Sequence, residues 1–205
     1  MTSPAPWWAL LSSAAAPALL IGGWTAAAHL QPYAFDSTVQ TISALAARTA
    51  TDRWLMTTAL ICVGLCHVVT SLGLPAAARP GRLVLALGGV ATVLVAAFPL
   101  PPAGPAPAHA ASATVAFTAL ALWPALSWHR HADVPITLRP AMACAAAAVL
   151  LGLVAWFAVS LTTGDHGGLT ERLAAAAQAC WPLLVALSTR RAGPPPFHRG
   201  GWMGR

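Results

Sequence analysis

The sequence has few charged residues and no lysine. Charged residues make up only 8% of its 205 residues, whereas hydrophobic residues make up 58%. An ordinary soluble domain carries roughly a quarter of its residues as Asp, Glu, Lys and Arg, because those side chains cover the surface that water contacts. The composition therefore excludes an ordinary soluble domain and indicates a membrane protein.

Acidic residues are also scarce, with five against eleven arginines, so the formal net charge is +6. A nucleic-acid surface would place basic residues along one face together with stacking aromatic rings. These arginines instead lie in short connectors and in the tail. We therefore expect no nucleic-acid partner.

The chain has no cysteine outside its apolar segments. Cys62, Cys66, Cys144 and Cys180 all lie within such segments, where a free cysteine behaves as a small hydrophobic residue. The run from Cys62 to His67 is one residue longer than a c-type haem attachment motif, and that motif needs an accessible loop. We expect Cys62, Cys66 and His67 to belong to the core.

What the sequence does contain is a series of apolar segments of about 20 residues, the length that crosses a bilayer as a helix. They predict an all-α membrane protein in which residues 1–190 form a single six-helix transmembrane domain. The predicted spans are about 7–28, 54–74, 83–100, 108–127, 140–161 and 172–189. Residues 191–205, rich in Pro, Gly and Arg, are predicted to form a disordered basic cytoplasmic tail.

The connector between the first two spans is polar but carries apolar residues at helical spacing. Ser37 and Gln40 fit a capping box near Val39, Ile42 and Leu45. This pattern predicts a short helix that lies in the membrane interface within the first external loop.

The arginines are distributed unequally between the two sides of the predicted bundle. Three lie on one side, namely Arg48, Arg53 and Arg172, and eight lie on the other, namely Arg79, Arg82, Arg130, Arg139, Arg190, Arg191, Arg199 and Arg205. Because cytoplasmic loops carry the excess of basic residues, both termini are predicted in the cytoplasm. We expect a multi-pass protein of the cell membrane.

Small residues within the spans predict where helices approach one another. Gly22 with Gly23, Gly88 with Gly89 and the alanines of residues 143–148 are suited to close packing. Lipid gives helices no hydrophobic reason to associate, so close backbone approach has to supply the packing.

Short motifs occur in a recognisable order along the chain. They are Thr41-Ile42-Ser43-Ala44-Leu45, Arg53-Trp54-Leu55-Met56, Phe98-Pro99, His109 at the start of the fourth span, and Leu169-Thr170-Glu171-Arg172-Leu173. Over residues 10–190 the chain resembles the DUF998 family of bacterial integral membrane proteins. It has Ala44 where that family's Ile-Ser-Glu-Leu-like motif is acidic, and Leu100 where an acidic residue often follows Phe-Pro. The resemblance implies fold and topology, and the family has no known function.

Several residues capable of chemistry are predicted on the external side. They are His29, Asp36, Asp52, His109, Asp165, His166 and Glu171. A metal site or a general acid–base pair needs these residue types, although polar residues also belong in loops. The metal-ligand candidates are His29, His109, His166, Asp36, Asp165 and Glu171, and we expect His109 to approach His29 or one of the acids.

No further catalytic motif accompanies these residues, so the sequence assigns no catalytic residue and no cofactor. Gln178, Ser112, Thr114 and Thr118 could either line a polar pathway or form hydrogen bonds between helices. No charged residue lies deep in any predicted span, which disfavours an ion-coupled transporter.

The leading hypothesis is a non-catalytic interaction or lipid-environment module with an external polar cap. Its expected partners are membrane lipids. The sequence does not decide whether it also binds another membrane protein or a second copy of the chain. There are two alternatives. One is an outward-facing membrane enzyme, namely a metal-assisted hydrolase that acts on lipid or envelope precursors, and the other is a small-solute transporter. Transport would require a cavity that reaches the midplane between the fourth and sixth spans.

Overall fold

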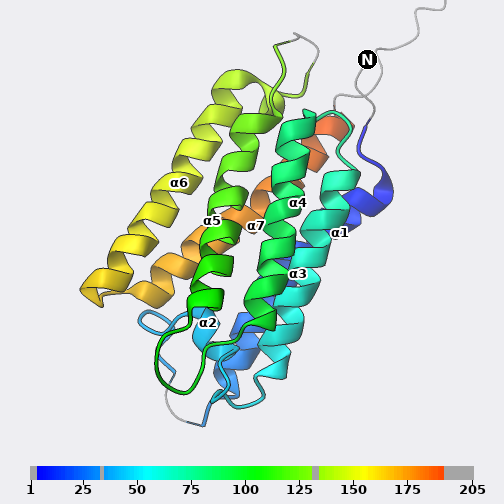
Figure 1. Ribbon diagram of the computed structural model, residues 1–205. Coiled ribbons are helices and arrows are strands. Elements are labelled where there is room, and N and C mark those ends of the chain that lie inside the picture. Colours follow the sequence, from blue (N-terminus) through cyan, green and yellow to red (C-terminus); the bar gives the residue numbers. More distant parts are fainter. Residues whose placement is uncertain (1–3, 33–34, 131–133, 192–205) are drawn as a thin grey trace, which may run out of the picture.

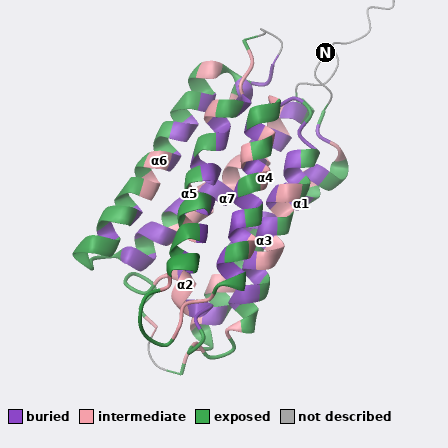
Figure 2. Cartoon of the chain, viewed as in Figure 1, coloured by how far each residue is buried: buried purple, intermediate pink, exposed green. Residues whose placement is uncertain are grey.

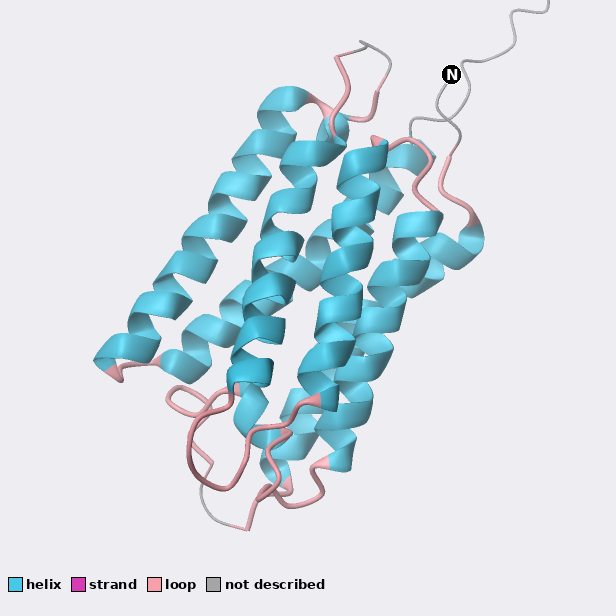
Figure 3. Cartoon of the chain, viewed as in Figure 1, coloured by secondary structure: helices cyan, strands magenta, loops and turns pink. Residues whose placement is uncertain are grey.

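The computed structural model describes residues 4–32, 35–130 and 134–191, and every regular element in those ranges is a helix (Figure 3). The predicted all-α class is therefore confirmed. The predicted tail from residue 192 onward lies outside the described residues. The elements are α1 (Trp7–His29), α2 (Ile42–Leu45), α3 (Trp54–Leu72), α4 (Arg79–Ala97), α5 (Pro107–Ser127), η1 (Ile136–Leu138), α6 (Pro140–Thr163) and α7 (Gly167–Arg191).

The six long helices form a closed ring. Each packs on the next in chain order, from α1 on α3 through to α6 on α7, and α7 returns to pack on α1. Figure 1 shows α7 passing behind α5, with α2 and the connectors that join α1 to α3 and α4 to α5 at one end of the bundle. Across the ring, α5 and α7 also contact each other, though less extensively than neighbouring helices do.

Five of the long helices, α1, α3, α4, α5 and α6, are long and apolar enough to cross a membrane. Large apolar side chains such as Leu83 (71% exposed) and Val149 (62% exposed) point outward, as they do where a helix faces lipid. The chain is thus a multi-pass membrane protein. α7 has 25 residues, but it carries Glu171, Arg172 and Gln178 and does not reach the same apolar character.

α4 and α7 begin several residues earlier than the sequence predicts, and α7 begins at Gly167 instead of 172. α4 begins at Arg79 instead of 83, because Pro80 suits a first helical turn and Arg82 belongs to the helix. The Arg82 guanidinium donates to the carbonyls of Ser71 (2.8 Å) and Leu72 (3.1 Å), which end α3. The arginine therefore supplies donors to carbonyls that a helix C-terminus leaves unpaired.

The capping box predicted in the first connector is wrong. Thr41 is the N-cap of α2, and its hydroxyl accepts a hydrogen bond from the Ala44 amide at 3.2 Å. Ser37 and Gln40 lie before that cap, in a turn. Ile42 and Leu45 are buried in the protein core, so the apolar stripe of this short helix packs on the bundle.

The predicted glycine contacts are only partly right. A Cβ on Gly89 would lie 2.5 Å from the carbonyl oxygen of Gly64, and a Cβ on Gly23 would lie 2.6 Å from Ala59. Gly22 faces open space, with nothing within 4 Å. Burial also differs between the helices. Figure 2 shows that α6 is largely exposed, whereas α3 and α4 have many buried residues.

Candidate functional site

The candidate site lies at the end of the bundle that holds α2. There the connector between α1 and α3 meets the connector between α4 and α5 and the start of α7 (Figure 1). The Asp36 carboxylate closes a turn by accepting hydrogen bonds from the Thr38 hydroxyl (2.6 Å) and amide (2.9 Å). These hydrogen bonds, the hydroxyl's first, lower the pKa of Asp36 below its ordinary value.

Glu171 connects α7 to α2. Its side chain is only 4% exposed, and its carboxylate accepts hydrogen bonds from the Ile42 amide and from the Ser43 hydroxyl at 3.3 Å. The first amides of a helix have no partner within the helix, so the carboxylate satisfies a donor that would otherwise be unpaired at the start of α2. In return, these donors stabilise a carboxylate that has been removed from water.

Arg172 holds the segment just before α2. Its Nη1 donates to the carbonyl oxygens of Ser37 and Gln40, both at 2.8 Å, and to that of Gly168 at 2.9 Å. The guanidinium also lies 5.9 Å from the Trp24 ring centroid and 5.8 Å from that of Phe35. Such contacts are favourable for a cation over an aromatic face.

Gly168 allows the connector to approach this closely. A Cβ at this position would lie 2.6 Å from the Ser37 carbonyl oxygen. The Gly168 amide donates to the Val39 carbonyl at 3.0 Å, and the Leu169 amide donates to the Thr38 carbonyl at 2.9 Å. The free amides that begin α7 therefore bind the connector. We call Gly168, Glu171 and Arg172 the loop clamp.

Next to the loop clamp lies a cavity of about 360 Å³, which we call the outer cavity because the sequence predicts this end of the bundle on the external side. Its walls are mainly apolar residues from the halves of α5 and α6 nearest α2, and several of these, including Ala110, Ala158 and Leu161, are exposed at the bundle surface. The cavity is thus open sideways between the two helices. Its polar lining comes from Thr41, Ser43, His109, Thr114, Thr118 and Glu171.

His109 is buried at the start of α5, where its Nδ1 lies 2.9 Å from the Phe98 carbonyl oxygen. Because a carbonyl can only accept, Nδ1 must carry the proton, and in the neutral ring Nε2 is then the acceptor. His109 and Glu171 line the same cavity. The structure thus brings together two of the predicted site residues.

The other predicted residues do not join that cavity. His29, Asp36, Asp52, Asp165 and His166 are all exposed, and none lines it. Asp36 lies near enough to His166 for their charges to interact. Within the described ranges, no group of three His, Cys, Asp or Glu side chains could hold a metal ion.

A smaller cavity of about 60 Å³ lies inside the ring and shares Ser43, Phe117 and Glu171 with the outer cavity. His67 and Gln178 also line it. Gln178 donates to the Phe117 carbonyl at 2.8 Å, so it forms a hydrogen bond between α7 and α5. This cavity lies closer to the middle of the bundle, and its lining is also mainly apolar.

Sequence reasoning missed three important residues of this site. The sequence motifs contain Thr41, Ser43 and Arg172 but indicate no role for them at the site, and Arg172 was otherwise used only as a topology signal. The sequence did contain one indication: Gly167-Gly168 stands directly before an acidic and a basic residue at the start of a helix. A glycine at that point permits close approach of another backbone.

A closed ring of six long helices, five of them apolar enough to span a membrane, defines a multi-pass α-helical membrane protein. The chain matches the model of one family, described as a protein of unknown function (DUF998), over residues 13–188. The match covers most of the chain, so the chain belongs to this family, as the sequence motifs predicted. No curated protein and no solved structure matches it.

Proposed function

We propose that α7 is a sixth span and that both termini lie on the cytoplasmic side of the cell membrane. A helix of 25 residues is about 37 Å long at 1.5 Å per residue, enough for a hydrocarbon core of about 30 Å. Its polar residues at the outer end contact the protein, as in the loop clamp, so they need not face lipid. The arginine asymmetry supports the orientation, and residues 1–190 then form one transmembrane domain.

Single cysteines provide the test of this topology. In a variant with the four native cysteines replaced by alanine, Ala103→Cys and Asp165→Cys should be labelled by a membrane-impermeant maleimide in intact cells. Pro75→Cys should be labelled only after permeabilisation. All three positions are exposed, so accessibility within the protein does not limit the reaction. Labelling of Pro75→Cys in intact cells would contradict the orientation.

We further propose that the protein is a non-catalytic lipid-environment module that holds a single-chain amphiphile in the outer cavity. The observation that carries this proposal is the combination of an apolar cavity open sideways between α5 and α6 with a buried carboxylate, Glu171, at one end. Its volume of about 360 Å³ falls within the range of small-molecule sites. An apolar chain can enter from the bilayer without crossing water.

The polar lining favours a headgroup that donates hydrogen bonds. A carboxylate can accept about four hydrogen bonds, and Ile42 and Ser43 leave acceptor capacity on Glu171. Nε2 of neutral His109 is a second acceptor. An ammonium or hydroxyl headgroup therefore suits this end better than a sulfonate or phosphate, whose negative charge the carboxylate would repel.

Filling the cavity should prevent binding. Ala158 lines the outer cavity, whereas Ala155, which is on the same helix and is also exposed, does not. We expect Ala158→Trp to weaken binding of dodecylamine about tenfold or more, corresponding to about 1.4 kcal/mol or more, and Ala155→Trp to leave it unchanged. Isothermal titration in detergent measures both. Equal affinity of the two variants, or equal binding of dodecyl sulfonate, would contradict the proposal.

A catalytic alternative rests on His109 and Glu171, which line one cavity as a base and a carboxylate. They could activate water against an ester bond of a bound lipid, with His109 Nε2 accepting the proton. Turnover of a long-chain fluorogenic ester that disappears in His109→Ala would favour this alternative. Binding without turnover favours the non-catalytic module.

A further inference from the structure

A second groove lies at the other end of the bundle, where α6 begins and α7 ends. It has a volume of about 680 Å³ and lies between η1, the first turn of α6 and the last turns of α7. Its lining includes Arg139, Arg191, Met142, Trp181 and Leu184. We call it the inner groove, because the proposed topology places it on the cytoplasmic side.

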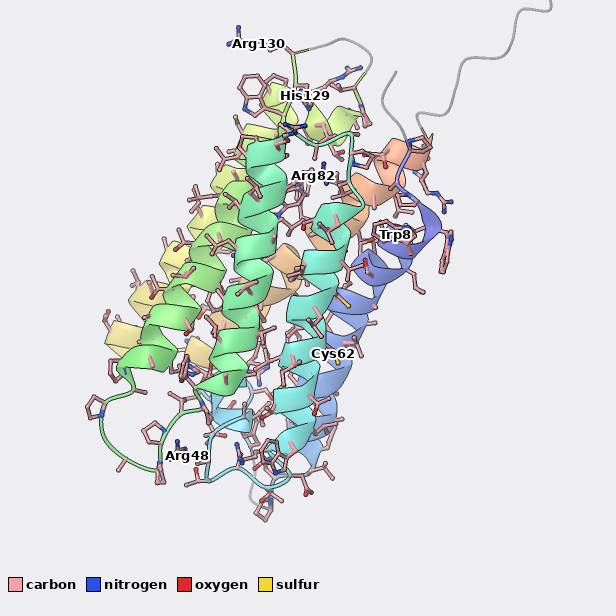
Figure 4. All side chains as sticks on the ribbon, turned by 45° about the vertical axis from the view of Figure 1, so that its right-hand side comes forward. Trp8, Arg48, Cys62, Arg82, His129 and Arg130 are labelled. Atoms are coloured by element: carbon pink, nitrogen blue, oxygen red, sulfur yellow. The ribbon has the colours of Figure 1, made fainter. Side chains whose placement is uncertain are left out.

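The end of the bundle that holds the inner groove is strongly basic. Figure 4 shows Arg82, His129 and Arg130 at this end and Arg48 at the other. The acidic side chains that the structure describes belong to the opposite end, in the connectors and the loop clamp, and Asp133 lies outside the described residues. Among the described residues, basic side chains therefore outnumber acidic ones at this end, which favours an anion near the inner groove.

The walls of the inner groove are apolar and partly open. Ile136 is 57% exposed, Leu184 is 49% exposed and Met142 is 40% exposed. Trp181 is half-buried beside them, and tryptophan favours the level of the lipid headgroups. Two arginines at the rim of an apolar wall match a ligand with an anionic head and an apolar body.

The hydroxyl groups of Thr137 and Ser188 in the inner groove already donate hydrogen bonds within the protein. Ser188 donates to the Val185 carbonyl at 2.9 Å, so the Thr137 hydroxyl must be the donor in the hydrogen bond that joins Thr137 and Ser188. Neither hydroxyl has a second proton to donate. The cationic donors that line the groove are the guanidinium groups of Arg139 and Arg191.

We propose that the inner groove is a binding site for an anionic phospholipid, with Arg139 and Arg191 on the phosphate and the acyl chains along Met142 and Leu184. Guanidinium groups bind phosphate oxygens through paired charge-assisted hydrogen bonds. A net negative headgroup is required, because a zwitterionic lipid carries its own cation next to the phosphate. This site is separate from the outer cavity and does not depend on what that cavity holds.

The test compares two variants that lose the same charge from the same end of the bundle. Arg139 and Arg191 line the inner groove, whereas Arg79 and Arg190 do not. For purified full-length protein in detergent, native mass spectrometry should show tight retention of phosphatidylglycerol and little of phosphatidylcholine. Arg139→Gln with Arg191→Gln should weaken retention of phosphatidylglycerol about 30-fold, which corresponds to about 2 kcal/mol. Arg79→Gln with Arg190→Gln should stay within about threefold of the original protein, because neither side chain lines the groove.

Three outcomes would overturn the proposal. An equal loss in both double variants would mean that charge acts diffusely, without a site. Equal retention of phosphatidylcholine would remove the requirement for an anionic headgroup, and full retention in the Arg139 and Arg191 variant would exclude those residues. If that variant does not fold, Leu184→Trp, which fills the groove and keeps both charges, should weaken retention of phosphatidylglycerol by a similar factor.

Discussion

Replacing Glu171 with alanine is expected to lower the free energy of unfolding by about 2–4 kcal/mol, because two effects act together. The Ile42 amide loses its acceptor inside the protein, and an unsatisfied buried donor costs about 1–3 kcal/mol. The hydrogen bond from the Ser43 hydroxyl is also lost, and the missing side chain leaves empty space beside the outer cavity. Thermal unfolding in detergent measures the change.

Two variants act as controls for Glu171→Ala. Glu171→Gln keeps an oxygen acceptor for the Ile42 amide and should recover more than half of the lost stability. Asp165→Ala removes an exposed carboxylate from the neighbouring connector and should change stability by less than about 0.5 kcal/mol. Hydrogen exchange over residues 37–46 should rise in Glu171→Ala alone. Unchanged stability and exchange in that variant would mean that the carboxylate does not hold α2.

A comparably large loss is expected for Gly89→Ala, at about 1–3 kcal/mol. The added Cβ would lie 2.5 Å from the Gly64 carbonyl oxygen, which is backbone and cannot move aside as a flexible side chain could. α3 and α4 would have to separate, and close approach is what drives helices together in lipid. Steric trapping in bicelles measures this free energy directly.

Gly152→Ala is the matched control, because a Cβ there would meet nothing within 4 Å. It lies on a long helix like Gly89, but on a side that faces away from neighbouring helices. Alanine also favours helix more than glycine does, so stability should stay equal or rise slightly. Equal losses of stability in Gly89→Ala and Gly152→Ala would show that helix propensity, and not helix packing, determines the effect of replacing these glycines.

The helices were predictable because bilayer thickness imposes a minimum length of apolar sequence. Predicted spans and observed helices agree closely where proline marks a start, as at Pro107 and Pro140. They differ where polar residues continue a helix. Arg79 and Arg82 resemble a connector by composition, but in the fold Arg82 binds the end of α3.

The candidate site was only partly predictable, because its main contacts join residues far apart in sequence. The sequence placed Glu171 and His109 on one side but could not show that the carboxylate meets Ile42, 129 positions earlier in the chain. His109 was predicted to anchor the start of its span near another histidine or an acid. The structure places His109 and Glu171 around one cavity and also gives His109 a hydrogen bond to the Phe98 carbonyl, a backbone group that residue patterns do not reveal.

The most direct test of the central proposal, the amphiphile in the outer cavity, is to find where a bound chain lies. Dodecylamine with a diazirine near its methyl end can be photolysed with the protein in nanodiscs, and the labelled peptides can be identified by mass spectrometry. We predict labels concentrated on Phe117 and Val154, which line the outer cavity, and their loss in Ala158→Trp. Labels spread evenly over lipid-facing positions such as Leu83 and Val149, unchanged by Ala158→Trp, would contradict the proposal.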